Sequence, residues 1–161
     1  MDTVLHTIPP IADANCRCLI LGTMPSPKSR EAAFYYAHPQ NRFWRAMAAV
    51  LGEILPETND GRAQMLLRHG IALWDVLKSC RIEGASDASI KEPEANDIAG
   101  LLRKYPAIER VYTTGGAAYR LYMRLSLPKT GIVPTRLPSP SAANAKMSLA
   151  DITEAYRAIL E

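Results

Sequence analysis

The sequence predicts an α/β fold: a three-layer sandwich in which helices cover both faces of a four-stranded, mostly parallel sheet, within a single domain over residues 1–161. Short, continuously apolar segments alternate along the chain with segments whose apolar residues have helical spacing, a pattern typical of parallel sheets. The first and fourth apolar segments each end in a loop rich in proline and serine. In a parallel sheet both loops lie at the carboxyl edge, where open α/β folds bind ligands.

Each element of this fold has its own signal in the sequence. Four apolar segments are predicted as strands: 16–21, 71–76, 108–114 and 131–137. Five segments with an apolar stripe and end signals are predicted as helices: 42–51, 59–69, 93–105, 116–125 and 148–159. Asn59 or Asp60 can cap the second helix, and Ser148 with Asp151 forms a capping box for the last. Three segments are expected to be irregular: 1–15, 22–40 and 80–93.

The formal net charge of +3 neither demands nor excludes a nucleic-acid partner. Basic residues gather beside both proline–serine loops: Lys28, Arg30, Arg42 and Arg45 near the first, and Arg136 and Lys146 near the second. Either group can equally be an ordinary solvated surface. No apolar run approaches the roughly 20 residues that cross a bilayer, and no secretory signal is recognisable. We therefore expect a soluble, cytoplasmic protein.

Several common kinds of catalytic site are absent from the sequence. There is no GxxxxGK[ST] phosphate loop and no GxSxG turn. The cysteines and histidines are scattered, so we expect no disulfide framework, no metal site and no cofactor. Gly115-Gly116 before a predicted helix is a weak indication of a phosphate site and is more typical of a tight turn. Asp75, at the end of a predicted strand, is expected to make a structural hydrogen bond.

An amide and two tyrosines remain as candidates in the first loop. Asn41 stands where a helix is predicted to begin, so its side chain can either cap that helix or act on a ligand. Tyr35 and Tyr36 lie in a polar loop without helical partners, which favours stacking on a ligand. Phe43 and Trp44 have helical spacing and are predicted to belong to the core.

Five segments, in their order and spacing, resemble the uracil-DNA glycosylase superfamily. Residues 36–44 (YAHPQNRFW) are similar to the segment after the first motif of mismatch-specific uracil/thymine-DNA glycosylases, and residues 137–143 (LPSPSAA) to the second motif of the superfamily. Residues 70–77, 84–87 and 96–97 extend the resemblance over nearly the whole chain. The resemblance implies a DNA-repair enzyme that hydrolyses the N-glycosidic bond of a base flipped out of DNA.

The first motif distinguishes the branches of this superfamily. Mismatch-specific enzymes carry a catalytic asparagine at the position of Met24, and a thioether cannot orient water as an amide can. Residues 22–26 (GTMPS) instead resemble the hypoxanthine-DNA glycosylase branch, whose essential asparagine lies in a later N-x-F-W element. This resemblance places the catalytic role on Asn41, with hypoxanthine as the expected base and uracil or xanthine after it.

The resemblance also implies the remaining roles. The flipped base stacks on Tyr36, and backbone N–H groups after the first strand hold an oxygen of the leaving base. The implied substrate-binding residues are Gly22, Thr23, Met24, Pro25, Ser26, Tyr36 and Thr114. The residues implied to grip the DNA strand are Ser139, Pro140, Ser141, Ala142 and Ala143. Ala143 stands where relatives often have a bulky wedge, and Thr114 where many have an asparagine that reads the base edge.

Two alternatives stay open. One is a mismatch-specific uracil/thymine-DNA glycosylase, and the other is a catalytically silent module that binds DNA or a nucleotide at the same edge. The expected partner is DNA with a damaged or deaminated base, bound by a monomer without a metal or a membrane. A monofunctional reaction is expected, because no lysine presents itself as a Schiff-base nucleophile.

Overall fold

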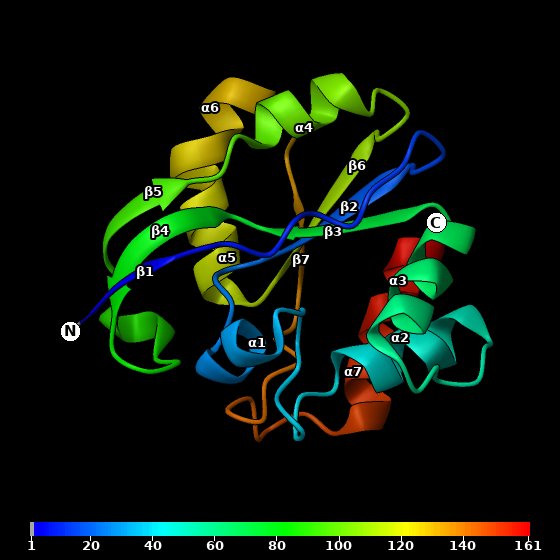
Figure 1. The fold of residues 1–161 in the computed structure, drawn as a ribbon. Helices are drawn as coiled ribbons and strands as arrows, with labels where there is room; N and C mark the ends of the chain where they lie inside the picture. The colour runs from blue at the N-terminus through cyan, green and yellow to red at the C-terminus, as the bar shows by residue number, and fades with distance from the viewer. Residues whose placement is uncertain (1) are drawn as a thin grey trace.

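A computed structural model describes residues 2–161 and confirms the four-stranded parallel sheet (Figure 1). The strands lie in the order β3-β2-β6-β7 and every neighbouring pair is parallel. Their bounds are β2 Cys18–Gly22, β3 Ile71–Asp75, β6 Arg110–Thr114 and β7 Thr135–Leu137. They fall within, or one residue beyond, the four segments predicted from apolar runs. Their carboxyl ends therefore share one edge, as predicted.

Strand β2 is buried along its whole length because helices cover both faces of the sheet. Cys18 and Ile20 contribute to one hydrophobic core, and Leu19 and Leu21 contribute to the other. This alternation follows from the two-residue period of a strand. A continuously apolar sequence is thus what a central strand between two cores requires.

The helices form the outer layers of the sandwich (Figure 1). Helices α2 (Phe43–Leu51), α3 (Asn59–Arg68) and α7 (Leu149–Tyr156) contribute to the first core, and α4 (Ile98–Lys104) and α5 (Gly116–Leu121) to the second. The predicted capping box of Ser148 and Asp151 is present on α7. The N-cap of α3 is Thr58, not Asn59 or Asp60. The remaining helical segments are α1 Pro27–Ala32, η1 Asp87–Ser89, the π-helical turn η2 Tyr122–Ser126, α6 Leu127–Thr130 and η3 Arg157–Leu160.

A second, antiparallel sheet was not predicted. It consists of β1 (Asp2–Leu5), β4 (Leu77–Ile82) and β5 (Lys91–Ala95) in the order β1-β4-β5. The expectations of irregular chain over 1–15 and 80–93, and of a helix starting at Pro93, were wrong in these segments. Both outer strands are mostly solvent-exposed and polar, so they carry little apolar signal. Pro93 is tolerated because β5 is an edge strand.

The predicted loop 22–40 contains the short helix α1. Ser26 caps it by accepting a hydrogen bond from the backbone N–H of Ser29, and Pro27 occupies its first turn. Serine before proline is a recognised helix start, which the search for apolar periodicity missed because α1 buries only one residue, Ser29. Within residues 2–161, no helix combines the length and the apolar character needed to cross a membrane.

Candidate functional site

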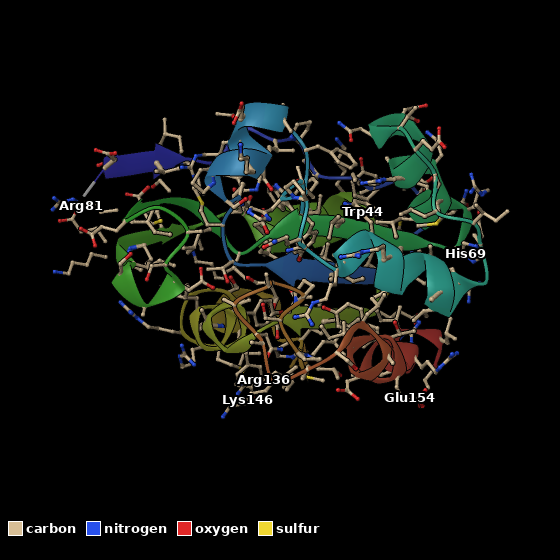
Figure 2. All side chains as sticks on the ribbon, turned by 90° about the horizontal axis from the view of Figure 1, so that it is seen from below. Trp44, His69, Arg81, Arg136, Lys146 and Glu154 are labelled. Atoms are coloured by element: carbon tan, nitrogen blue, oxygen red, sulfur yellow. The ribbon has the colours of Figure 1, made fainter. Side chains whose placement is uncertain are left out.

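A cavity of about 310 Å³ lies at the carboxyl edge of the parallel sheet. Two segments enclose it: residues 23–41, here called the first loop, and residues 138–147, here called the second loop. Figure 2 views the molecule from the side that carries both loops, with Arg136 and Lys146 at its lower edge. Twelve of the residues proposed from sequence line the cavity: Gly22, Thr23, Met24, Pro25, Ser26, Tyr36, Asn41, Thr114, Ser139, Pro140, Ser141 and Ala142. Ala143 is exposed and lies outside this lining.

Tyr36 is fixed on two sides at the wall of the cavity. Its ring stacks on Phe43 with centroids 4.1 Å apart, and its hydroxyl is hydrogen-bonded to the hydroxyl of Thr114 at 2.9 Å. Its backbone is left-handed, with φ of 51°. Burial, and then the negative charge of Asp75, raise the pKa of Tyr36, so the phenol stays protonated. Thr114 is thereby tied to Tyr36 across the site.

Tyr35 has a structural position, unlike its neighbour. Its side chain is only 2% exposed, and its hydroxyl donates to the backbone carbonyl of Pro9 at 2.8 Å. Its own carbonyl accepts a hydrogen bond from the indole N–H of Trp44 at 2.8 Å. The core positions predicted for Phe43 and Trp44 are confirmed, and Tyr35 joins them there. Of the two tyrosines, Tyr36 is the one available to a ligand.

Asn41 directly precedes the N-cap of α2, which is Arg42 and not Asn41, and its side chain borders the cavity. Its side-chain oxygen Oδ1 accepts a hydrogen bond from the backbone N–H of Phe43 at 2.9 Å, at the start of α2. The side chain is partly exposed and lines the cavity. Within the part of the chain that the structure describes, the amide nitrogen Nδ2 has no hydrogen-bond partner. The hydrogen bond at the start of α2 uses the side-chain oxygen and leaves the N–H donors free, so it is compatible with a role of Asn41 toward a ligand.

A buried hydrogen-bonded pair of side chains lies beneath the cavity. Nε2 of His6 is 2.8 Å from Oδ2 of Asp75, and the two side chains are 1% and 6% exposed. This is the structural hydrogen bond expected for Asp75. The other carboxylate oxygen, Oδ1, has no protein partner among residues 2–161 and lies against Gly22, where a Cβ atom would come within 2.5 Å of it. Gly22 is thus required for Asp75 to reach the cavity wall.

Asp87 is a second carboxyl group at the cavity that sequence reasoning did not single out. Burial raises the pKa of this carboxyl and the charge of Asp75 adds to the rise, whereas a hydrogen bond with Thr23 and the charge of Arg120 oppose it. Asp87 lies in a stretch that was expected to be an irregular loop. The hydrophobic pattern of the sequence therefore did not indicate that its carboxyl group would approach the edge of the sheet. No cluster of three or more potential metal ligands occurs among the described residues.

Arg42 holds the second loop in place from the base of the first. Its guanidinium donates to the carbonyls of Ser141 at 2.8 Å and Asn144 at 3.0 Å, and also to that of Met147. Its backbone N–H donates to the carbonyl of Pro140 at 3.0 Å. Sequence reasoning had treated Arg42 as one member of a basic group. Its partners lie about a hundred positions further along the chain, so only the fold brings them together.

The serines of the second loop partly satisfy its own backbone. The hydroxyl of Ser139 accepts from the N–H of Ser141 at 3.2 Å, and that of Ser141 accepts from the N–H of Ala143 at 3.1 Å. Such local hydrogen bonds shape a compact turn. Each hydroxyl retains its proton, so both serines can still donate to an anion.

Comparisons with known proteins agree with this fold. Residues 9–160 match the uracil DNA glycosylase superfamily. A hypoxanthine DNA glycosylase from Methanosarcina acetivorans is 35% identical over 143 residues, 87% of this chain and 88% of the relative. One from Methanosarcina barkeri is 39% identical over 108 residues, 66% and 68% of the two chains. A protein from M. acetivorans solved by solution NMR, provisionally named a uracil DNA glycosylase, superposes with a TM-score of 0.80 at 31% identity, covering 97% of this chain and 98% of its own. The chain therefore belongs to the uracil DNA glycosylase superfamily.

Proposed function

We propose that this protein hydrolyses the N-glycosidic bond of a deaminated base flipped out of DNA, with hypoxanthine as the first substrate and uracil or xanthine after it. The observation that carries the proposal is an asparagine whose N–H donors are free at the wall of a cavity of about 310 Å³. Such a volume is in the range of small-ligand sites, about 300–1,000 Å³. Two relatives, 35% and 39% identical to this chain over the aligned residues, are named hypoxanthine DNA glycosylases.

The cavity offers groups that suit a deaminated base. Deamination turns an amino-substituted ring carbon into a carbonyl beside a ring N–H. The unpartnered Oδ1 of Asp75 can accept that N–H, and backbone N–H groups of Thr23 and Met24 can donate to the carbonyl. Adenine and cytosine present a lone pair in place of the N–H, which a carboxylate repels. Tyr36 supplies a ring against which the base can stack, at the cavity wall.

The reaction needs no covalent intermediate. Water attacks C1′ of the sugar while the bond between C1′ and the base nitrogen breaks, and the water's proton goes to the departing base. Negative charge develops on the base, where pre-oriented donors are worth about 3–4 kcal/mol each. Asn41 positions the water or donates to the base through Nδ2. An amide is too weak a base to remove a proton, so its role is orientation. We propose a monofunctional glycosylase that acts as a monomer in the cytoplasm.

The decisive test compares three variants on labelled oligonucleotides that carry hypoxanthine, xanthine or uracil, with alkali to cleave abasic sites. Asn41→Ala is expected to lose at least about 100-fold in single-turnover rate. Asn41→Asp keeps an oxygen for the Phe43 N–H but loses both donors, so it should unfold like the wild type yet cleave poorly. Asn59→Ala, on an exposed residue of α3, is the matched control.

The outcomes separate the alternatives. Wild-type rates in both Asn41→Ala and Asn41→Asp would leave Asn41 with only its structural hydrogen bond to the Phe43 N–H. Activity confined to uracil or thymine in mismatched pairs would favour the mismatch-specific enzyme. Binding of DNA without cleavage of any damaged base would favour the silent module.

A further inference from the structure

Two arginine side chains converge on one glycine beside the second loop. A Cβ atom built on Gly116 would lie 2.7 Å from Nη2 of Arg136 and 2.9 Å from Nη1 of Arg120. Arg136 belongs to strand β7 and Arg120 to helix α5, so the sheet and the helix each supply one guanidinium. The ring of Tyr119 lies 5.9 Å from the Arg136 guanidinium, a distance that fits a cation–π contact. The Tyr119 ring thus supports one member of the pair, Arg136.

No carboxylate in the described part of the chain is in contact with this pair of positive charges, although Asp87 is close enough to Arg120 for the charge of the arginine to lower the pKa of that carboxyl. Neither Arg120 nor Arg136 forms an ion pair within 4.0 Å among residues 2–161, although both side chains are exposed. Two like charges side by side repel each other, and an anion between them removes that repulsion. Guanidinium groups bind phosphate oxygens through paired, charge-assisted hydrogen bonds. The arrangement suits a phosphodiester better than a solvated surface.

The pair also lies next to the proposed DNA-binding loop. A Cβ atom on Gly115 would lie 3.2 Å from Cβ of Ser139, which lines the cavity, and the N–H of Gly115 donates to the carbonyl of Leu137 at 2.8 Å. Gly115 and Gly116 are adjacent, so their Cα atoms are about 3.8 Å apart. The two guanidiniums and Ser139 are thus neighbours of consecutive glycines, and Ser139 itself lines the cavity.

We propose that Arg120 and Arg136 jointly bind a backbone phosphate of the DNA strand beside the flipped nucleotide. The proposal rests on the proposed function and adds a contact outside the second loop. Gly116 has no side chain because the two guanidiniums occupy that space. A phosphate held here fixes the position of the strand and carries no information about the base. The Gly115-Gly116 pair thus contributes to phosphate binding through the arginines that it admits.

Equilibrium binding to an undamaged duplex tests this without any chemistry. Arg120→Gln with Arg136→Gln should weaken binding roughly tenfold near 0.1 M salt and lower the slope of log K against log salt by about one. Arg103→Gln, on α4 at the opposite end of the sheet in Figure 1, removes an exposed charge as a control and should bind like the wild type. At saturating hypoxanthine DNA, the double variant should keep its single-turnover rate within about twofold, since the contact positions the strand only.

Gly116→Ala provides a test that leaves the charge unchanged. Its methyl group displaces the ends of two flexible side chains, so folding is retained while DNA affinity falls in the same direction as in the double variant. Wild-type affinity in the double variant would overturn the proposal, as would an equal loss in Arg103→Gln. If the wild type binds DNA through these arginines but cleaves no damaged base, the proposed function fails and the phosphate site stands. If cleavage is intact and the variants bind normally, the phosphate site fails alone.

Discussion

The two loops that enclose the cavity are held in place by different forces. Aromatic stacking anchors the first loop. The ring centroids of Phe34 and Trp44 are 5.3 Å apart, and those of Tyr36 and Phe43 are 4.1 Å apart. The second loop has no aromatic residue and is held largely by hydrogen bonds to one side chain, Arg42. Ring packing tolerates loss of a hydrogen bond, whereas the guanidinium of Arg42 alone donates to several carbonyls of the second loop. We therefore expect the first loop to resist single substitutions that remove a hydrogen bond and the second loop to be sensitive to changes at Arg42.

The largest effect is expected from the ring at the centre of the first loop's anchor. Phe43→Ala removes a fully buried side chain that stacks on Tyr36 and should destabilise the fold by about 3–5 kcal/mol. Denaturant unfolding measures this loss. Phe43→Leu fills most of the space and should cost less. A loss below 1 kcal/mol in the alanine variant would contradict the view that ring burial fixes this loop.

The second-largest effect is expected when the anchor of the second loop, Arg42, is changed. Arg42→Lys keeps the charge but cannot reach several carbonyls at once, so we expect a loss of about 1–3 kcal/mol in stability and faster proteolysis within residues 138–147. Limited proteolysis with mass spectrometry locates the cut. Arg45→Lys, whose side chain makes one long hydrogen bond of 3.4 Å, is the control. Equal protection of the loop in both variants would argue against the anchoring role of Arg42.

A smaller effect tests the polar contact of Tyr36. Tyr36→Phe keeps the ring stacking and removes the hydroxyl that pairs with Thr114, at a cost of about 1 kcal/mol. A double-mutant cycle with Thr114→Val should give a coupling of about 0.5–1 kcal/mol. Additive single losses, measured by thermal unfolding, would show that the hydroxyls do not interact in solution.

The smallest effect lies where the second loop enters α7. The backbone N–H and the hydroxyl of Ser148 hold the pKa of Asp151 below its ordinary value of 3.8. A lowered pKa in the folded protein adds stability at neutral pH that is lost as pH falls through and below 3.8. The gap in melting temperature between the wild type and Asp151→Asn should therefore narrow from pH 6 to pH 3. A gap that is constant with pH would contradict this linkage.

The parallel sheet could be predicted from sequence because its strands are buried on both faces. Residues 18–22 and 71–75 are apolar runs that end at polar residues, and such runs have few other interpretations. The second sheet could not be predicted in the same way. Its outer strands, including KEPEA at residues 91–95, face solvent and owe their conformation to pairing with β4. Pairing partners far apart in sequence leave no local pattern.

The candidate site likewise has a part that could be predicted from the sequence and a part that could not. The order of the motifs was enough to identify Asn41, Tyr36 and the second loop as candidate parts of the site. The fold brings these segments together at one cavity. The hydrogen-bond partners that hold the site residues in place could not be predicted from the sequence. His6 and Asp75 are hydrogen-bonded although 69 positions separate them in the sequence, and Arg42 and Ser141 are hydrogen-bonded although 99 positions separate them. Sequence resemblance identifies residues that face a ligand, whereas the groups that hold them become visible only in three dimensions.

The segments that build the cavity come from almost the full length of the chain. His6 lies beneath it near one end, and Ser141 closes it near the other. A nascent chain therefore cannot complete the cavity before the segment around Ser141 has been synthesised. Conversely, a bound base bridges early and late segments and stabilises the entire fold in proportion to its occupancy. The melting temperature of the protein thus reports directly on which free bases enter the cavity.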